Sequence, residues 1–162
     1  MDPIEEAHRQ WVAHGWAEAA DGMAMVTSLV RVHQLMIERI DAVLRTYDLT
    51  FARYEILRVL AFSRAGRMPM TRLGSLLQVH PTSVTSAVAR LERQGYVARV
   101  RSAEDGRVVL ATLTAAAVRV VEDATAELNA EVFTAPGLDP DGVETLTRQL
   151  ALLRADAGDP VR

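Results

Sequence analysis

The chain has 162 residues, of which 49% are hydrophobic and 24% charged, and this length is enough for one ordinary domain with a buried core. It contains no cysteine, which excludes a disulfide framework, a thiolate zinc site and a cysteine nucleophile. The acidic N-terminus lacks the basic start of a signal peptide, and no apolar run approaches membrane-spanning length. We therefore expect a cytoplasmic protein without a membrane partner.

The net charge of −3 is unevenly distributed along the chain. All 18 basic residues are arginine; residues 64–107 hold 8 of them against 3 acids (8 − 3 = +5). Residues 1–63 hold 6 against 9 acids (6 − 9 = −3), and residues 108–162 hold 4 against 9 (4 − 9 = −5). A basic middle between acidic flanks favours an oriented contact with nucleic acid, and the alternative is a chance fluctuation of a few charges.

The N-terminal third of the chain is predicted to be helical. A short helix is expected around residues 5–18, and a long amphipathic helix then follows from Met25 to about Tyr47 because apolar residues recur at steps of three and four. Thr50 is a suitable N-cap for a helix that begins at Phe51 and is stopped by residues 65–66. Arg58 is expected on the wetter side of that helix.

Two shorter helices are predicted next, at residues 71–77 and from Pro81 to about Gln94. Proline is tolerated in the first turn of a helix, and His80 stands at the capping position before it. Three apolar residues share one face of the second helix and are expected to pack inward: Val84, Val88 and Leu91.

A β-hairpin follows, with Gly95 as a cap of the preceding helix. The two β-rich runs are residues 96–101 and 107–113, and the Asp105-Gly106 pair between them is a turn signal. Beyond the hairpin, Thr114 can cap a long helix that continues through Phe133.

The last helix is expected to start at Pro140, after Asp139. The two C-terminal helices carry more apolar surface than one small domain can cover, which predicts an obligate homodimer. The residues expected to supply that surface are Val121, Leu128, Val132, Leu146, Leu150 and Leu153.

Two short helices joined by a tight turn and followed by a hairpin predict a winged helix-turn-helix. The expected fold is mainly α with a small β-wing, together with a helical dimerisation region. Its parts are an N-terminal extension and long helix that contribute to dimerisation (1–47), a DNA-binding domain (48–113) and C-terminal dimerisation helices (114–162).

In this fold the second short helix enters the major groove of DNA, and an arginine of the wing can enter the minor groove. Asp105 and Gly106 are expected to order the wing tip, either through an ion pair with a nearby arginine or through backbone N–H groups. The alternative for Asp105 and Gly106 is that they only form the turn. The alternative for the polar face of the second short helix is that it is only solvated. The predicted DNA-binding residues are Thr71, Arg72, Pro81, Thr82, Ser83, Thr85, Ser86, Arg90, Arg101 and Arg107.

Four segments resemble the multiple antibiotic resistance regulator (MarR) family, in order and at the expected spacing: DLTFARYEIL at 48–57, PTSVT at 81–85, RLERQGYVAR at 90–99, and DGR at 105–107 followed by Leu113-Thr114. The resemblance covers roughly residues 22–155. It implies a ligand-responsive transcriptional regulator, in most members a repressor, that binds a pseudo-palindromic operator on double-stranded DNA as a homodimer with intertwined terminal helices. Gln78 and Ala117 stand where the family usually has glycine, and we expect slightly altered turn geometry there.

The segment before residue 22 is similar to the extra N-terminal helix of the urate-responsive branch of that family. There a tryptophan lies at a ligand pocket beside an acidic residue and two arginines. Trp11, Glu55 and Arg99 match three of these positions, and Ala87 occupies the second arginine position. The resemblance implies a site for a small anionic effector near Trp11, Glu55 and Arg99, and the alternative is that Trp11 and Trp16 only pack the extra helix.

The sequence gives little support for an enzyme or a metal-binding protein. The chain has no phosphate-cradling glycine loop, HExxH pair or GxSxG elbow, so we expect no enzyme and no cofactor. Its four histidines lack compact ligand spacing, and no metal site is expected. The alternatives that stay open are a metal-sensing regulator and a winged helix that binds protein instead of DNA.

Overall fold

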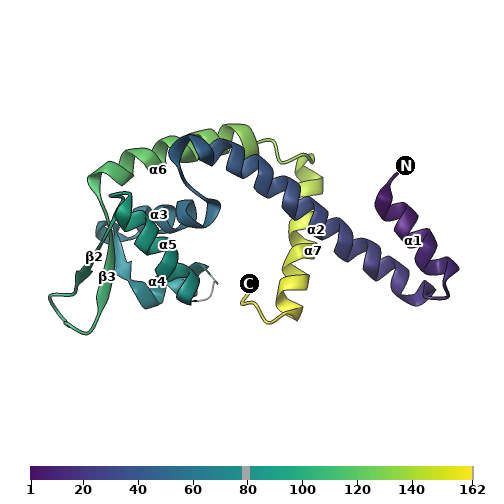
Figure 1. Ribbon diagram of the computed structural model, residues 1–162, viewed down its shortest axis with the longest axis horizontal. Coiled ribbons are helices and arrows are strands. Elements are labelled where there is room, and N and C mark those ends of the chain that lie inside the picture. Colours follow the sequence, from purple (N-terminus) through teal and green to yellow (C-terminus); the bar gives the residue numbers. More distant parts are fainter. Residues whose placement is uncertain (78–80, 162) are drawn as a thin grey trace.

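The computed structural model describes residues 1–77 and 81–161, a mainly helical chain with a small antiparallel sheet at one end (Figure 1). The expectations for Gln78 and for His80 as a cap lie outside these residues. Among the described residues, no helix combines the length and apolar character that a membrane crossing needs. The helices are α1 (Pro3–Ala13), α2 (Ala17–Leu44), α3 (Phe51–Phe62), α4 (Met70–Leu77), α5 (Pro81–Arg93), α6 (Ala115–Leu128) and α7 (Pro140–Asp156), and the strands are β1 (Arg67–Pro69), β2 (Val97–Arg101) and β3 (Val109–Leu113).

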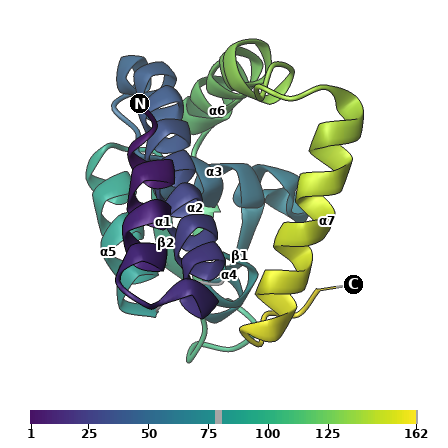
Figure 2. The same cartoon turned by 90° about the vertical axis from the view of Figure 1, so that its right-hand side faces the viewer.

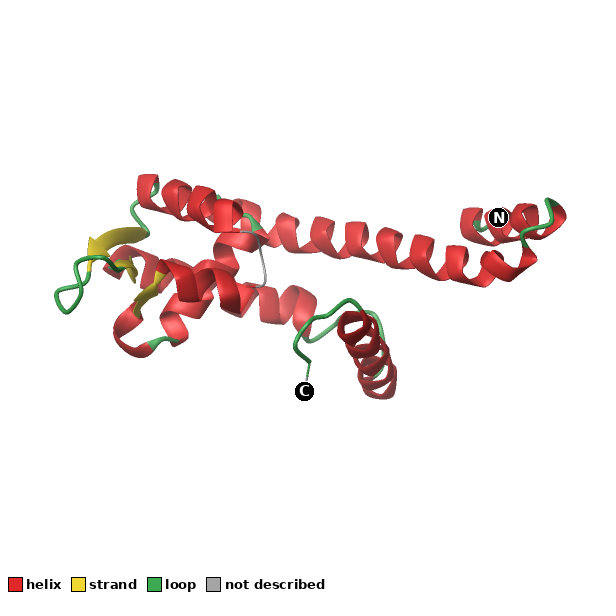
Figure 3. Cartoon of the chain, turned by 90° about the horizontal axis from the view of Figure 1, so that it is seen from below, coloured by secondary structure: helices red, strands yellow, loops and turns green. Residues whose placement is uncertain are grey.

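The N-terminal helix is shorter than expected. It ends at Ala13 because Gly15 adopts a left-handed backbone, with φ +84°, which reverses the chain. The predicted extension to residue 18 is therefore wrong, and Ala17 begins α2, which starts earlier than expected and ends in a short 3₁₀ turn at Tyr47. Figure 3 shows α2 as a long arm that carries α1 at its far end.

Helix α3 begins where the sequence predicts, because the Thr50 hydroxyl accepts a hydrogen bond from the Arg53 backbone N–H at 3.3 Å. It ends at Phe62. The expectation that Arg58 faces water is wrong: its side chain is 15% exposed and pairs with Glu122 on α6 at 2.9 Å. An arginine can extend its stem along an apolar surface and end in an ion pair, so its polarity alone does not place it in solvent.

The sheet has three strands in the order β1-β3-β2, all antiparallel. The predicted hairpin is confirmed as β2 and β3, with Val97 opposite Leu113 and Arg101 opposite Val109. β3 begins two residues later than expected because Arg107 belongs to the turn. Strand β1, which pairs with β3, was not predicted from the sequence.

The core lies where α3, α5, α6 and β3 meet. Leu57, Leu60 and Leu91 are fully buried there, together with Ala111 of β3 and Leu128 of α6. The inward face predicted for α5 is confirmed, because Val84, Val88 and Leu91 are 3%, 0% and 0% exposed. Helix α3 contacts both α5 and α6 and so lies at the centre of this domain.

The C-terminal helices start as predicted. Thr114 caps α6 and Asp139 caps α7, and α6 continues through a π-helical turn to Phe133. Within α7, residues Pro140–Asp156, no side chain is buried, and Figure 2 shows this helix standing apart from α2 and α6.

The expected dimer surface is wrong for half of its members. Val121, Leu128 and Val132 are buried in the core of their own chain, with at most 4% exposure. Leu146 and Leu153 remain exposed. Helix α6 packs its apolar face against α2 and α3, so the apolar pattern of α6 is satisfied within one chain.

The fold predicts a large difference between two identical substitutions. Leu57→Ala should lower the free energy of unfolding by about 2–5 kcal/mol, because it removes a fully buried side chain and leaves a cavity. Leu76→Ala, on the exposed side of α4, should cost less than about 1 kcal/mol. Urea unfolding at one protein concentration measures both, and equal losses would contradict the assigned core.

Candidate nucleic-acid interface

The outer face of α5 is polar and exposed. Because Val84, Val88 and Leu91 turn inward, the opposite side of the same helix presents hydroxyl groups and arginine to solvent. The residues predicted to contact DNA that are exposed on this helix are Thr82, Ser83, Thr85, Ser86 and Arg90. Pro81 is the first residue of α5. Small hydroxyl side chains let the helix backbone approach a DNA groove closely, where they can meet phosphates and base edges.

A groove of about 460 Å³ runs between this face and the start of α3. Ser83, Ser86 and Arg90 line it from α5, and Thr50 and Arg53 line it from the other side. The guanidinium Nη2 of Arg90 lies 3.7 Å from Oδ2 of Asp48, and half of the Arg90 side chain is exposed. Thr50 and Arg53 were not predicted from the sequence to belong to this surface.

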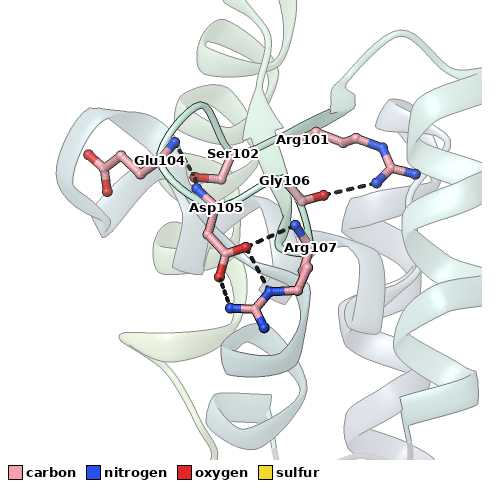
Figure 4. A network of polar contacts seen from close by, with 6 residues as sticks. All are labelled: Arg101, Ser102, Glu104, Asp105, Gly106 and Arg107. Carbon is pink, nitrogen blue, oxygen red and sulfur yellow. Dashed lines mark hydrogen bonds and ion pairs between the residues drawn. The ribbon is translucent and has the colours of Figure 1, made fainter.

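Asp105 makes several hydrogen bonds at the tip of the hairpin (Figure 4). One oxygen of its carboxylate accepts hydrogen bonds from the backbone N–H and the Nε of Arg107, and the other accepts from Nη2, all at 3.0 Å. Both kinds of contact expected for Asp105 are thus present. Arg101 donates to the Gly106 carbonyl at 2.9 Å, which ties the strand to the turn.

These contacts hold the Arg107 guanidinium in position beside the Asp105 carboxylate. The hydrogen bonds from Arg107 lower the pKa of Asp105, and the same hydrogen bonds raise the pKa of Arg107. The Arg107 side chain is nevertheless 90% exposed. The wing therefore presents a cation at its tip that is oriented but accessible.

The predicted residues of α4 lie elsewhere on the domain. Thr71 and Arg72 are exposed near the start of that helix. Arg72 lines a second groove of about 460 Å³, together with Arg64 and Arg67. Neither Arg64 nor Arg67 was singled out in the sequence, although both belong to the basic segment 64–107.

One chain does not bring the three expected effector residues together. Trp11 lies on α1 and packs edge-on against Trp16, with ring centroids 5.5 Å apart. Figures 1 and 3 place α1 at the opposite end of the molecule from the wing. Burial raises the pKa of Glu55 on α3, whereas Arg99 on β2 is occupied by Glu92, with Nη2 2.7 Å from its carboxylate. The Arg99 hydrogen bonds lower the pKa of Glu92.

Over residues 1–77 and 81–161, no three histidine, aspartate or glutamate side chains gather as metal ligands.

The wing geometry predicts a measurable pH effect. Because Arg107 lowers the pKa of Asp105, the contact stabilises the folded tip above the ordinary aspartate pKa and is lost as the pH falls through the lowered value. Arg107→Ala should raise the Asp105 pKa toward its ordinary value. A carboxyl carbon NMR titration measures this, and an unchanged pKa in the variant would contradict the contact in Figure 4.

Comparisons with known proteins show which family shares this fold. A sequence profile of the MarR family matches residues 47–108. A search of curated proteins finds none that matches the chain. Among solved structures, an organohalide-sensing regulator in its 2,4-dichlorophenol-bound form is 17% identical, with a TM-score of 0.75 and coverage of 82% of this chain and 78% of that chain, a likeness of fold alone.

Two regulators from Streptomyces coelicolor are more similar in sequence. Sco3205, a MarR family transcriptional regulator solved in complex with DNA, is 25% identical, with a TM-score of 0.74 and coverage of 87% of this chain and 89% of that chain. Sco5413, also a MarR family transcriptional regulator, is 42% identical, with a TM-score of 0.77 and coverage of 86% of this chain and 99% of that chain. At that identity over nearly the whole length of Sco5413, the winged helix-turn-helix chain described above belongs to the MarR family of transcriptional regulators.

Proposed function

We propose that the protein is a transcriptional repressor that binds a pseudo-palindromic operator as a homodimer and is released from it by a small anionic effector. The observation that carries DNA binding is the joint exposure of the α5 outer face and the Arg107 wing tip on one domain. Helix α5 would enter the major groove, and the wing would place Arg107 in the adjacent minor groove, where the potential is most negative. Repression is inferred by analogy with the family.

In this proposal residues 48–113 contact DNA, and the segments on either side form the dimer. The apolar side chains left exposed on α2 and α7 support it: a monomer would leave both stripes in water. They are Met25, Val26, Leu29, Val30, Val32, Leu35, Val143, Leu146, Leu152 and Leu153. A two-fold dimer would place two copies of α5 on half-sites one helical turn apart or a multiple of it, which is why the operator should be a pseudo-palindrome.

The effector site is proposed at Glu55 and Arg99, with Trp11 contributed by the second protomer, because one chain holds Trp11 far from the other two residues (Figures 1 and 3). Nε and Nη2 of Arg99 already donate to Glu92, so an anion that binds these two nitrogens would displace that carboxylate. Arg99 lies on β2, and such an exchange would change the support of the wing. An effector bound at Arg99 would in this way change the position of the wing and so the affinity for DNA.

The proposed dimer is tested by measuring the molar mass of the protein in solution. Static light scattering at micromolar concentration should report twice the chain mass of 17.8 kDa. Leu146→Glu should shift the distribution toward the single-chain mass, because it places a charge in the apolar stripe of α7. A well-folded wild-type monomer at that concentration would contradict the dimer and the palindrome with it.

Recognition is tested by comparing two arginines on duplexes selected from a random pool by the wild-type protein. Arg90→Ala should weaken binding by about 1–3 kcal/mol and relax base preference at particular positions if it pairs with a base, and Thr85→Ala should also weaken binding. Arg107→Ala should weaken binding across many sequences, most at A·T-rich flanks.

Titrations at several salt concentrations supply the readout. Unaltered binding by both α5 variants would remove α5 from the major groove, and unaltered affinity and salt slope of Arg107→Ala would remove the wing from the DNA. Binding of wild type that does not depend on salt would favour the alternative of a protein-binding winged helix.

A further inference from the structure

Arg53 is held in place at the start of α3. Its Nη1 donates to the backbone carbonyl of Asp48 at 2.9 Å and to Oε1 of Gln94 at 2.7 Å. Its Nε donates to the Thr50 hydroxyl at 3.3 Å. Three contacts from two separate segments fix the guanidinium, so little side-chain entropy remains to be lost when it binds a further group.

The remaining nitrogen of this guanidinium is available to a ligand. Within residues 1–77 and 81–161, Nη2 of Arg53 makes no hydrogen bond. Arg53 lines the groove of about 460 Å³ that it shares with Ser86 and Arg90 of the recognition helix. A groove with two guanidinium groups and several hydroxyl groups on its walls offers charged and neutral donors to a phosphate, whose oxygens accept hydrogen bonds.

Asp48 is the one carboxylate in the hydrogen-bonded network around this groove among the described residues. Its backbone is left-handed, with φ +49°, which turns it toward α5. Its Oδ2 accepts from Nε2 of Gln94 at 3.2 Å and lies 3.7 Å from Nη2 of Arg90. Two arginines against one aspartate leave the groove with a net positive charge, and the Asp48 side chain opposes any anion that enters.

We propose that Arg53 binds a phosphate of the DNA backbone in this groove, as a contact in addition to those proposed for the exposed face of α5 and for the wing. Gln94 and the Asp48 carbonyl act as positioning groups, because they hold the guanidinium without touching the phosphate. Asp48 weakens the contact through its carboxylate. The proposal rests on the DNA-binding function proposed above and names a residue that function did not include.

The test is the salt dependence of binding to a mixed-sequence duplex of about three helical turns. Each phosphate contact contributes about 0.9 to the slope of log K against log salt, so Arg53→Gln should reduce the slope by about 0.9 per protomer. Arg53→Lys retains the charge and should keep most of the slope. Arg119→Gln is the matched control, because it removes the same charge from an exposed site on α6, which α3 separates from α5 (Figure 1).

Asp48→Asn tests the same groove with the opposite sign. Asparagine tolerates the left-handed backbone, its carbonyl can still hold Arg53, and its amide oxygen can still accept from Gln94, so the geometry should survive the loss of charge. The variant should bind the duplex several-fold more tightly at low salt, and the gain should shrink as salt rises.

The outcomes separate this proposal from the one on which it depends. Wild type without salt-dependent duplex binding would overturn both. Wild type that binds with the expected dependence, alongside an Arg53→Gln protein with the same slope and unchanged thermal stability, would overturn the Arg53 contact alone. Equal slope losses in Arg53→Gln and Arg119→Gln would reduce the effect to general charge and would also overturn it.

Discussion

The interface depends on the burial of one face of α5 against the core. Val84, Val88 and Leu91 recur at steps of four and three, so they occupy one side of the helix, and each contributes about 1.5–3 kcal/mol when removed from water. That burial leaves the helix no freedom to rotate. The hydroxyl groups and Arg90 on the other side therefore have a fixed direction, and α3, which contacts α5, adds Thr50 and Arg53 beside them.

The wing applies the same principle through hydrogen bonds in place of apolar burial. An aspartate beside a DNA-facing arginine is repulsive to phosphate on charge alone. Asp105 instead accepts hydrogen bonds from both the backbone and the guanidinium of Arg107. Its negative charge lowers the net positive charge of the tip, and its hydrogen bonds fix the orientation of the guanidinium. Asp48 has a similar double character beside Arg53, because its carbonyl positions the arginine while its carboxylate opposes an anion.

Local signals in the sequence predicted most of the fold. Thr50, Thr114 and Asp139 marked helix starts because a cap is a contact over three residues. β1 was missed because three residues ending in proline show no alternation, and only pairing with β3 makes them a strand. Apolar periodicity identified the buried face of α6 but could not say whether its own chain or a partner covers it. The place of Arg53 in the groove was missed because Gln94, which accepts a hydrogen bond from it, is 41 residues away in sequence.

An NMR map of the deuterated protein, titrated with a duplex selected from a random pool, tests which surface of the protein binds DNA. The largest backbone amide shift changes should fall on the outer face of α5, at the wing tip between Arg101 and Arg107, and around Arg53. Helix α7 and the exposed arm of α2 should change little. Changes concentrated on α7 or α1, with α5 and the wing unaffected, would contradict the assignment of this surface to DNA.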